Sequence, residues 1–180
     1  AGKQLLSGRG VSDPVYTTYA WGDMDGDGFM DLAAGGPASA VVVYRNDKGV
    51  LQSAPVWRAS STDNTKSLAW GDVNGDGLLD LAVGNASSCM KDGGRACQRG
   101  RNQVYLNGGA ILNTTPNWQS GESDNTSSLA WGDMDGDGRL DLAVANALDC
   151  HDNNDDTTTC SGQERVYRQT ISGTLPISAT

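Results

Sequence analysis

The sequence lacks the motifs on which most enzymes and nucleic-acid-binding proteins depend. Its 180 residues include a single histidine, and no GxSxG, HExxH or glycine-rich phosphate-binding motif occurs. The chain has a formal charge of −9 and no basic patch, which argues against a nucleic-acid partner. No apolar run approaches the length of a transmembrane helix, so we expect no membrane insertion.

Catalysis would therefore have to rest on paired carboxylates, as it does in glycosidases. The candidate pairs are Asp155 with Asp156 and Glu122 with Asp124, and these are typical acidic residues of loops. The one histidine, His151, lies in a polar insert, where a solvated loop residue is the simpler interpretation. We expect no enzymatic activity.

What the sequence does contain is an acidic phrase of eleven residues in three copies: WGDMDGDGFMD from Trp21, WGDVNGDGLLD from Trp70 and WGDMDGDGRLD from Trp131. Ca²⁺ takes about six to eight oxygen ligands, and a short loop supplies them from alternate side chains and one backbone carbonyl. With the first Asp as position 1, positions 1, 3, 5 and 9 offer side-chain oxygens and position 7 a carbonyl. The predicted ligands of three calcium sites are Asp23, Asp25, Asp27, Phe29 and Asp31; Asp72, Asn74, Asp76, Leu78 and Asp80; and Asp133, Asp135, Asp137, Arg139 and Asp141.

The alternative to a metal site is a solvated acidic turn. Three copies in one frame make that alternative weak, and closely packed carboxylates without a cation would repel one another. Glycines at positions 4 and 6 allow the sharp turn that such a loop needs. Eleven of the 22 acidic residues lie in these phrases, and three Ca²⁺ ions would bring the formal charge from −9 to −3.

The acidic phrases mark three sequence repeats. Trp21 precedes Trp70 by 49 residues and Trp70 precedes Trp131 by 61, and each phrase is followed by a VYRN, VYLN or VYRQ segment. Short apolar runs bounded by Gly, Asn or Asp predict four strands per repeat, at about 66–71, 79–84, 102–107 and 111–118 in the second. Four short antiparallel strands repeated at this spacing favour propeller blades, with a solenoid of stacked hairpins as the alternative.

The pattern SLAWGDxNGDGxxDLAVGN resembles the FG-GAP or VCBS repeats of integrin-α-like calcium-binding β-propellers. The resemblance covers about residues 16–180 and implies an acidic, calcium-binding loop between the first two strands of each blade. Such propellers commonly have about seven blades. We therefore expect an all-β, incomplete or open propeller of three four-stranded antiparallel blades, at residues 16–60, 61–121 and 122–180.

Three blades cannot close a ring, because natural propellers have about four to eight. Copies of the chain could associate head to tail into a ring or a filament, or the chain could be part of a longer propeller. Residues 1–15 form an N-terminal segment that could donate a strand to another copy, with a disordered leader as the alternative.

The four cysteines allow three pairings. Cys89 and Cys97, like Cys150 and Cys160, bracket a polar insert at the same place in successive repeats, which favours two local disulfides over four free thiols. Zinc binding is less favoured, because no CxxC spacing occurs. Disulfides together with calcium loops predict a secreted, extracellular or cell-surface protein.

Three asparagines, Asn85, Asn113 and Asn125, lie in N-x-S/T sequons and are possible glycosylation sites, although chance would supply about two. The tryptophans at 21, 70 and 131 are expected to pack between blades, whereas Trp57 and Trp118 end outer strands and could be more accessible. We expect a calcium-stabilised structural or adhesive module that associates with itself or with other extracellular proteins. The alternative is a carbohydrate-binding, lectin-type propeller or a non-catalytic module of a polysaccharide-active protein.

Overall fold

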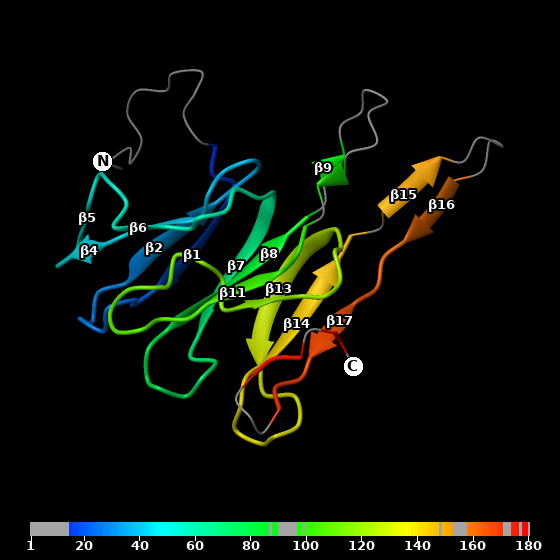
Figure 1. The fold of residues 1–180 in the computed structure, drawn as a ribbon. Coiled ribbons are helices and arrows are strands. Elements are labelled where there is room, and N and C mark those ends of the chain that lie inside the picture. Colours follow the sequence, from blue (N-terminus) through cyan, green and yellow to red (C-terminus); the bar gives the residue numbers. More distant parts are fainter. Residues whose placement is uncertain are drawn as a thin grey trace.

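The computed structural model describes residues 15–86, 88–89, 97–98, 100–147, 149–152, 158–170, 174–176 and 178–179, and all regular elements in these ranges are β-strands (Figure 1). The first repeat contains β1 (Thr18–Gly22), β2 (Asp31–Gly35), β3 (Val42–Tyr44), β4 (Asn46–Asp47), β5 (Val50–Leu51) and β6 (Trp57–Arg58). The second contains β7 (Thr65–Gly71), β8 (Asp80–Asn85), β9 (Ser88–Cys89), β10 (Cys97–Gln98), β11 (Gln103–Tyr105) and β12 (Trp118–Gln119). The third contains β13 (Thr126–Gly132), β14 (Asp141–Asn146), β15 (Asp149–Asp152), β16 (Thr158–Ser161) and β17 (Arg165–Tyr167).

These strands form three main sheets with meander order, here called the first, second and third sheets. Their orders are β1-β2-β3-β6, β7-β8-β11-β12 and β13-β14-β17, and all pairings are antiparallel. Three two-stranded hairpins, β4–β5, β9–β10 and β15–β16, complete the described strands. None of the sheets closes on itself, so the fold is an open, all-β arrangement.

The three sheets repeat one register. Each tryptophan of the acidic phrase pairs with the leucine that follows the phrase, and the glycine after it pairs with the aspartate at position 9, as in Trp21 with Leu32 and Gly22 with Asp31. Small and β-branched residues suit the second strands of the first and second sheets, where every residue is buried, whereas Ala143 in the second strand of the third sheet is exposed. Asp80–Asn85 of β8 is buried along its whole length.

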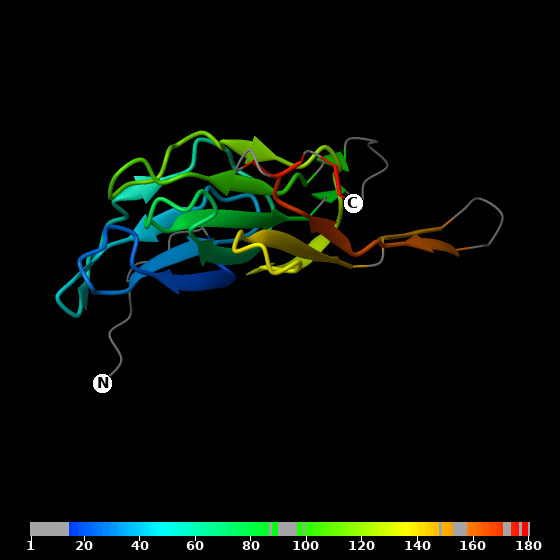
Figure 2. The same ribbon diagram turned by 90° about the horizontal axis from the view of Figure 1, so that it is seen from below.

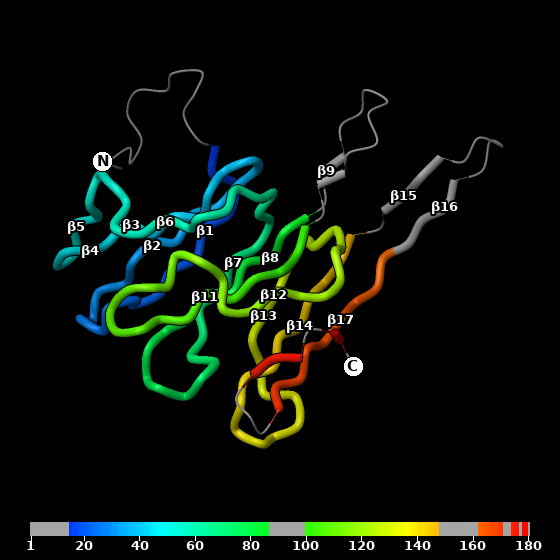
Figure 3. Tube along the Cα trace, in the orientation of Figure 1, coloured from blue at the N-terminus to red at the C-terminus, as the bar shows by residue number. Residues whose placement is uncertain are grey.

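The strands of successive sheets run along a common direction (Figure 2). The three acidic loops therefore emerge at the same end of the sheets, seen along the lower edge of Figure 3. This shared end follows from the register, because every loop joins the first two strands of its sheet. The repeated sequence thus builds three equivalent loops on one side of the molecule.

The hydrophobic core lies between sheets. One cluster joins Val43 and Trp57 of the first sheet to Leu81 and Tyr105 of the second, and a matching cluster joins the second sheet to Leu142 of the third. The outer tryptophans add edge-on ring contacts: the ring centroids of Trp57 and Tyr105 lie 5.2 Å apart, and those of Trp118 and Tyr167 lie 5.0 Å apart. Each sheet is therefore stabilised by the next, as expected of a repeat protein.

Two expectations change on the described residues. The strand predicted at 111–118 is the shorter β12, because residues 111–117 belong to the connection between β11 and β12, in which Leu112 forms an isolated bridge with Asn107. Trp57 was expected to be accessible, but its side chain is buried, with 3% of its surface exposed. The third sheet shows three strands; the fourth was predicted at the end of the chain, where residues 171–173, 177 and 180 lie outside the described ranges.

The N-terminal segment predicted to donate a strand also lies outside the described residues up to position 14. The VYRN, VYLN and VYRQ segments occupy the same place in each repeat. Their tyrosines are the last residues of the third strands: Tyr44 of β3, Tyr105 of β11 and Tyr167 of β17. Along the described part of the chain there is no helix with the length and apolar character to cross a bilayer.

Candidate metal centre

The first aspartate of each loop organises the turn. In the first loop the backbone N–H groups of Asp27 and Gly28 donate to the two carboxylate oxygens of Asp23, at 3.1 and 2.8 Å. The same two bonds form to Asp72 and Asp133 in the other loops. The glycines at positions 4 and 6 have φ between 72° and 88° in all three loops, a conformation that side chains with a Cβ rarely adopt.

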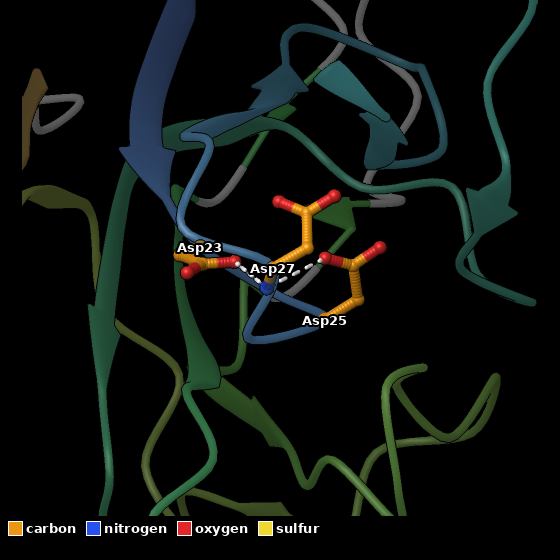
Figure 4. A group of neighbouring side chains, drawn as sticks. All are labelled: Asp23, Asp25 and Asp27. Carbon is orange, nitrogen blue, oxygen red and sulfur yellow. Dashed lines mark hydrogen bonds between the residues drawn. The ribbon is translucent and has the colours of Figure 1, made fainter. Parts of the chain in front are cut away.

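Carboxylates converge in two of the loops. Oxygens of Asp23, Asp25 and Asp27 lie within 4.8 Å of one another, on the chain reversal shown in Figure 4. Oxygens of Asp133, Asp135 and Asp141 meet the same limit in the third loop. In the second loop position 3 is Asn74, whose amide donates to Asp76 Oδ2 at 2.9 Å. These two acidic clusters are sites that could hold a metal ion.

The aspartate at position 9 joins its loop to the third strand of the sheet. Asp80 is fully buried, and its two oxygens accept the backbone N–H groups of Val73 (3.0 Å) and Asn107 (2.8 Å). Asp31 and Asp141 make the equivalent pairs of bonds in the other repeats. The sequence predicted position 9 only as a ligand; in the structure it also holds the loop in place.

Burial raises the proton affinity of Asp31 and Asp80. Desolvation raises the pKa of Asp31, and it raises the pKa of Asp80 to about 6, against the pull of the two backbone N–H groups. Neighbouring acids, Asp76 and Asp72, add a smaller upward effect. By contrast, backbone N–H groups led by that of Gly138 lower the pKa of the exposed Asp133.

The raised pKa of Asp80 predicts a pH dependence of stability without metal. Because the folded state binds this proton more tightly than the unfolded chain, the contribution to stability is fully present below about pH 4 and is lost as pH rises through about 6. Urea unfolding in calcium-free buffer should therefore give a smaller free energy at pH 7 than at pH 5. Asp80→Asn should flatten this slope, and an unchanged slope would contradict the assignment.

Two arginines from outside the acidic loops pair with aspartates of the first and third loops, a feature that the sequence interpretation missed. Arg45 Nη2 lies 2.5 Å from Asp25 Oδ2 and 3.6 Å from Asp27 Oδ2, and Arg168 pairs with Asp135. The second repeat has Leu106 at the position of these arginines, and there position 3 is an asparagine. Arginine thus accompanies Asp at position 3, and leucine accompanies Asn. The difference is visible in the sequence, because the third residue of the VYRN, VYLN and VYRQ segments is Arg, Leu and Arg.

Removing the arginine should strengthen cation binding at the first loop. Arg45→Leu copies the second repeat at this position but keeps Asp25, which leaves one more uncompensated negative charge beside the loop. We expect calcium affinity of that loop to rise about tenfold, since ligand charge tunes such sites. Isothermal titration calorimetry would measure it, with Arg58→Leu, a change at an exposed arginine of β6, as control. Equal affinities in the two variants would refute the charge argument.

The remaining predicted site residues differ in accessibility. Phe29 and Arg139 at position 7 are partly exposed, and Arg139 pairs with Asp137. Asn85 is fully buried and its amide donates to the carbonyl of Arg101, so the folded chain does not present it to a glycosyltransferase. Asn113 is exposed and Asn125 half-buried.

The predicted cysteine pairs lie on hairpins of the polar inserts. The backbone register pairs Cys89 with Cys97 in β9–β10, and Cys150 with Cys160 in β15–β16. The side chains of these strands lie outside the described residues, so the disulfides remain predictions.

The chain belongs to the FG-GAP-like repeat family. The family's model matches residues 23–83 and 95–144, which is more than half of the chain and includes all three acidic loops as far as position 9. Together with the open stack of antiparallel sheets, this match defines a β-propeller-type repeat module. No curated protein matches the sequence.

Proposed function

We propose that this chain is a calcium-binding, extracellular module that acts by associating with protein partners, including copies of itself. The observation that carries the proposal is the set of three equivalent acidic loops at one end of the sheets, two of which bring three carboxylates together. Modules of this repeat family typically have structural roles and mediate protein interactions, which also supports a role without catalysis.

The donor chemistry fits Ca²⁺. All candidate side-chain ligands are oxygens, and oxygens within 4.8 Å of one another can share one ion at the usual Ca–O distance of about 2.4 Å. The residues that would hold the ion are those at positions 1, 3, 5 and 9, with the carbonyl of position 7. A bound cation would relieve the repulsion among the carboxylates and link the loop more firmly to the strands around it.

The proposed extracellular location rests on calcium supply and on cysteine usage. Cα atoms of directly paired residues in antiparallel strands lie about 4.5–5.5 Å apart, within the range that a disulfide spans. The paired positions of Cys89 with Cys97 and of Cys150 with Cys160 support such bonds. Intact mass before and after reduction tests them.

Carbohydrate binding is less well supported. A lectin site would place an exposed aromatic ring beside a polar pocket. The polar hollow described on the third sheet, lined by Asp124, Asn125, Asn146, Gln163 and Arg165 among others, has no aromatic wall. Trp57 packs against Tyr105 instead of facing solvent.

Calcium titration of the chelated protein tests the proposal. We expect binding at micromolar to millimolar Ca²⁺, little competition from Mg²⁺, and a rise in unfolding free energy of about 2.7 kcal/mol per site at a hundredfold excess over Kd. Asp25→Asn should weaken one site, whereas Asp47→Asn, at an exposed acid of β4, should not. Absence of calcium binding in a folded protein would overturn the metal assignment.

A further inference from the structure

The first strands of successive sheets meet through the same hydrogen bond. The indole N–H of Trp70 in β7 donates to the carbonyl of Ala20 in β1 at 3.2 Å. The indole N–H of Trp131 in β13 donates to the carbonyl of Ala69 in β7, also at 3.2 Å. In the second and third sheets, one tryptophan is therefore bound by the sheet that precedes it.

A glycine makes room for each of these rings. A Cβ added at Gly22 would lie 2.4 Å from Cγ of Trp70, and one added at Gly71 would lie 2.6 Å from Cδ1 of Trp131. The ring of one sheet thus occupies the space above the glycine of the preceding sheet. The contact consists of a tryptophan on one side, and of a glycine and the carbonyl two residues before it on the other.

At the first sheet the tryptophan half of this contact has no partner among the residues that the structure describes. Trp21 is 54% exposed and Tyr19, two residues before it, is 53% exposed. The residues equivalent to Tyr19 are Leu68 and Leu129, which are 8% and 7% exposed because a preceding sheet covers them. Two large aromatic side chains therefore project from β1.

At the third sheet the receiving half is open. Within the described part of the chain, a Cβ at Gly132 would meet nothing within 4 Å. Met134 is 59% exposed, whereas the equivalent Met24 and Val73 are 2% and 7% exposed beneath the next sheet. Two adjoining hollows of about 170 and 220 Å³ lie on this face, and both are lined by Ala130, Ala143 and Val166; the first also includes Gly132.

We infer that the third sheet of one copy receives the first sheet of a second copy, a contact that rests on the protein association proposed above. Trp21 of the second copy lies over Gly132, its indole N–H donates to the carbonyl of Ala130, and Tyr19 enters the neighbouring hollow. The docked faces repeat the pairing that the chain already makes twice internally. Two copies joined at both ends give a closed ring of six sheets, within the range of about four to eight blades known for propellers.

A second repeated hydrogen bond supports this pairing. Asn107 Nδ2 donates to the carbonyl of Met24 in the preceding repeat at 2.7 Å, and Gln169 Nε2 donates to that of Val73 at 2.6 Å. Asn46 occupies the equivalent position in the first repeat, where its Nδ2 donates to the local carbonyl of Met30 and, among the described residues, to no carbonyl of another repeat. In the docked pair it would reach the carbonyl of Met134, the counterpart of Met24 and Val73.

The contact is confined to the region around the first strands. Tyr44, the counterpart of Tyr105 and Tyr167, already packs with Tyr16 in a buried cluster on the outer face of the first sheet. Tyr19 also replaces the leucine of the internal contacts, and the larger hollow beside Ala145 has room for the larger ring. The inference therefore depends on Trp21 and Tyr19 meeting the third sheet.

The test is the mass of the full chain in calcium, by light scattering and sedimentation equilibrium over a range of concentrations. We expect a dimer. Trp21→Ala should weaken it at least about thirtyfold, as loss of an interface hot spot does. Gly132→Val should weaken it comparably without a clash inside its own chain, and Ala143→Glu does the same at a site outside the acidic loop. Ile111→Ala, at an equally exposed apolar residue away from both faces, is the matched control.

Mixing the variants identifies the direction of the contact. A 1:1 mixture of Trp21→Ala and Gly132→Val retains one intact pairing, so dimers should reappear in the mixture although each variant alone is monomeric. A monomeric wild type, a dimer that survives all three substitutions, or a mixture that stays monomeric would overturn the inference. A series of larger oligomers would overturn the six-sheet ring. Calcium binding measured on the same samples separates these outcomes from failure of the metal assignment.

Discussion

Substituting Gly71 by valine should destabilise the protein by about 3 kcal/mol, since overpacking a tight contact costs about 1–3 kcal/mol and here displaces a hydrogen-bonded ring. The added Cβ would lie 2.6 Å from Cδ1 of Trp131, and the glycine is buried. To escape, the indole must move away from the carbonyl of Ala69 and loosen the cluster between the second and third sheets. Urea unfolding followed by tryptophan fluorescence would measure the loss.

Gly132→Val provides the matched control, because the same residue type follows the same WG dipeptide in a strand with the same register. Its Cβ meets nothing within 4 Å, so the free energy of unfolding should change by less than about 0.5 kcal/mol. Both proteins should be compared at concentrations where they are monomeric, since association shifts apparent stability. Equal losses of unfolding free energy in the two variants would show that the backbone conformation requires glycine at this position, and that space for the tryptophan ring of the next sheet does not.

These two glycines illustrate what could be predicted from the sequence. The phrase WGD showed that a tryptophan and a glycine recur before each loop, and inter-sheet packing was predicted for the tryptophans. The reason for the glycine lies in the next repeat, about 50 to 60 residues away, where the ring that needs the space is encoded. Local patterns predicted the elements; contacts between repeats depended on how the sheets stack.

The candidate metal centre likewise has features that local sequence patterns predicted and features that depend on contacts between distant segments. The loop spacing identified the carboxylates, and the glycines with positive φ lie at the predicted positions 4 and 6. The sequence interpretation did not find that position 9 binds two backbone N–H groups, one of them two residues beyond the third strand, because sheet formation alone brings that segment to the loop. The exchange of Arg45 and Asp25 for Leu106 and Asn74 was visible in the repeats and could have been found by aligning them.

The second large effect is expected for Asp80→Ala. The substitution leaves the buried N–H groups of Val73 and Asn107 without their acceptor, and each unsatisfied group costs about 1–3 kcal/mol, so the loss should be about 2–6 kcal/mol without any metal. The loss should be larger at pH 5 than at pH 7, because the raised pKa of Asp80 makes its own contribution greatest when the carboxyl is protonated. Asp80→Asn keeps one acceptor oxygen, so its free energy of unfolding should lie between that of the wild type and that of Asp80→Ala.

Asp76→Ala separates the structural role of the loop from its metal role. Asp76 lies in the same loop at position 5, and its carboxylate accepts exposed bonds from the backbone of Leu78 and the amide of Asn74. Without calcium this variant should lose less than about 1 kcal/mol, because water can replace those bonds. With saturating calcium, both variants should also lack the stabilisation that calcium at the second site gives the wild type. The loss in unfolding free energy caused by Asp76→Ala should therefore grow from a small value, and that caused by Asp80→Ala should grow from an already large one. A penalty for Asp76→Ala that is the same with and without calcium would remove the second loop from the set of metal sites and would leave the structural role of Asp80 intact.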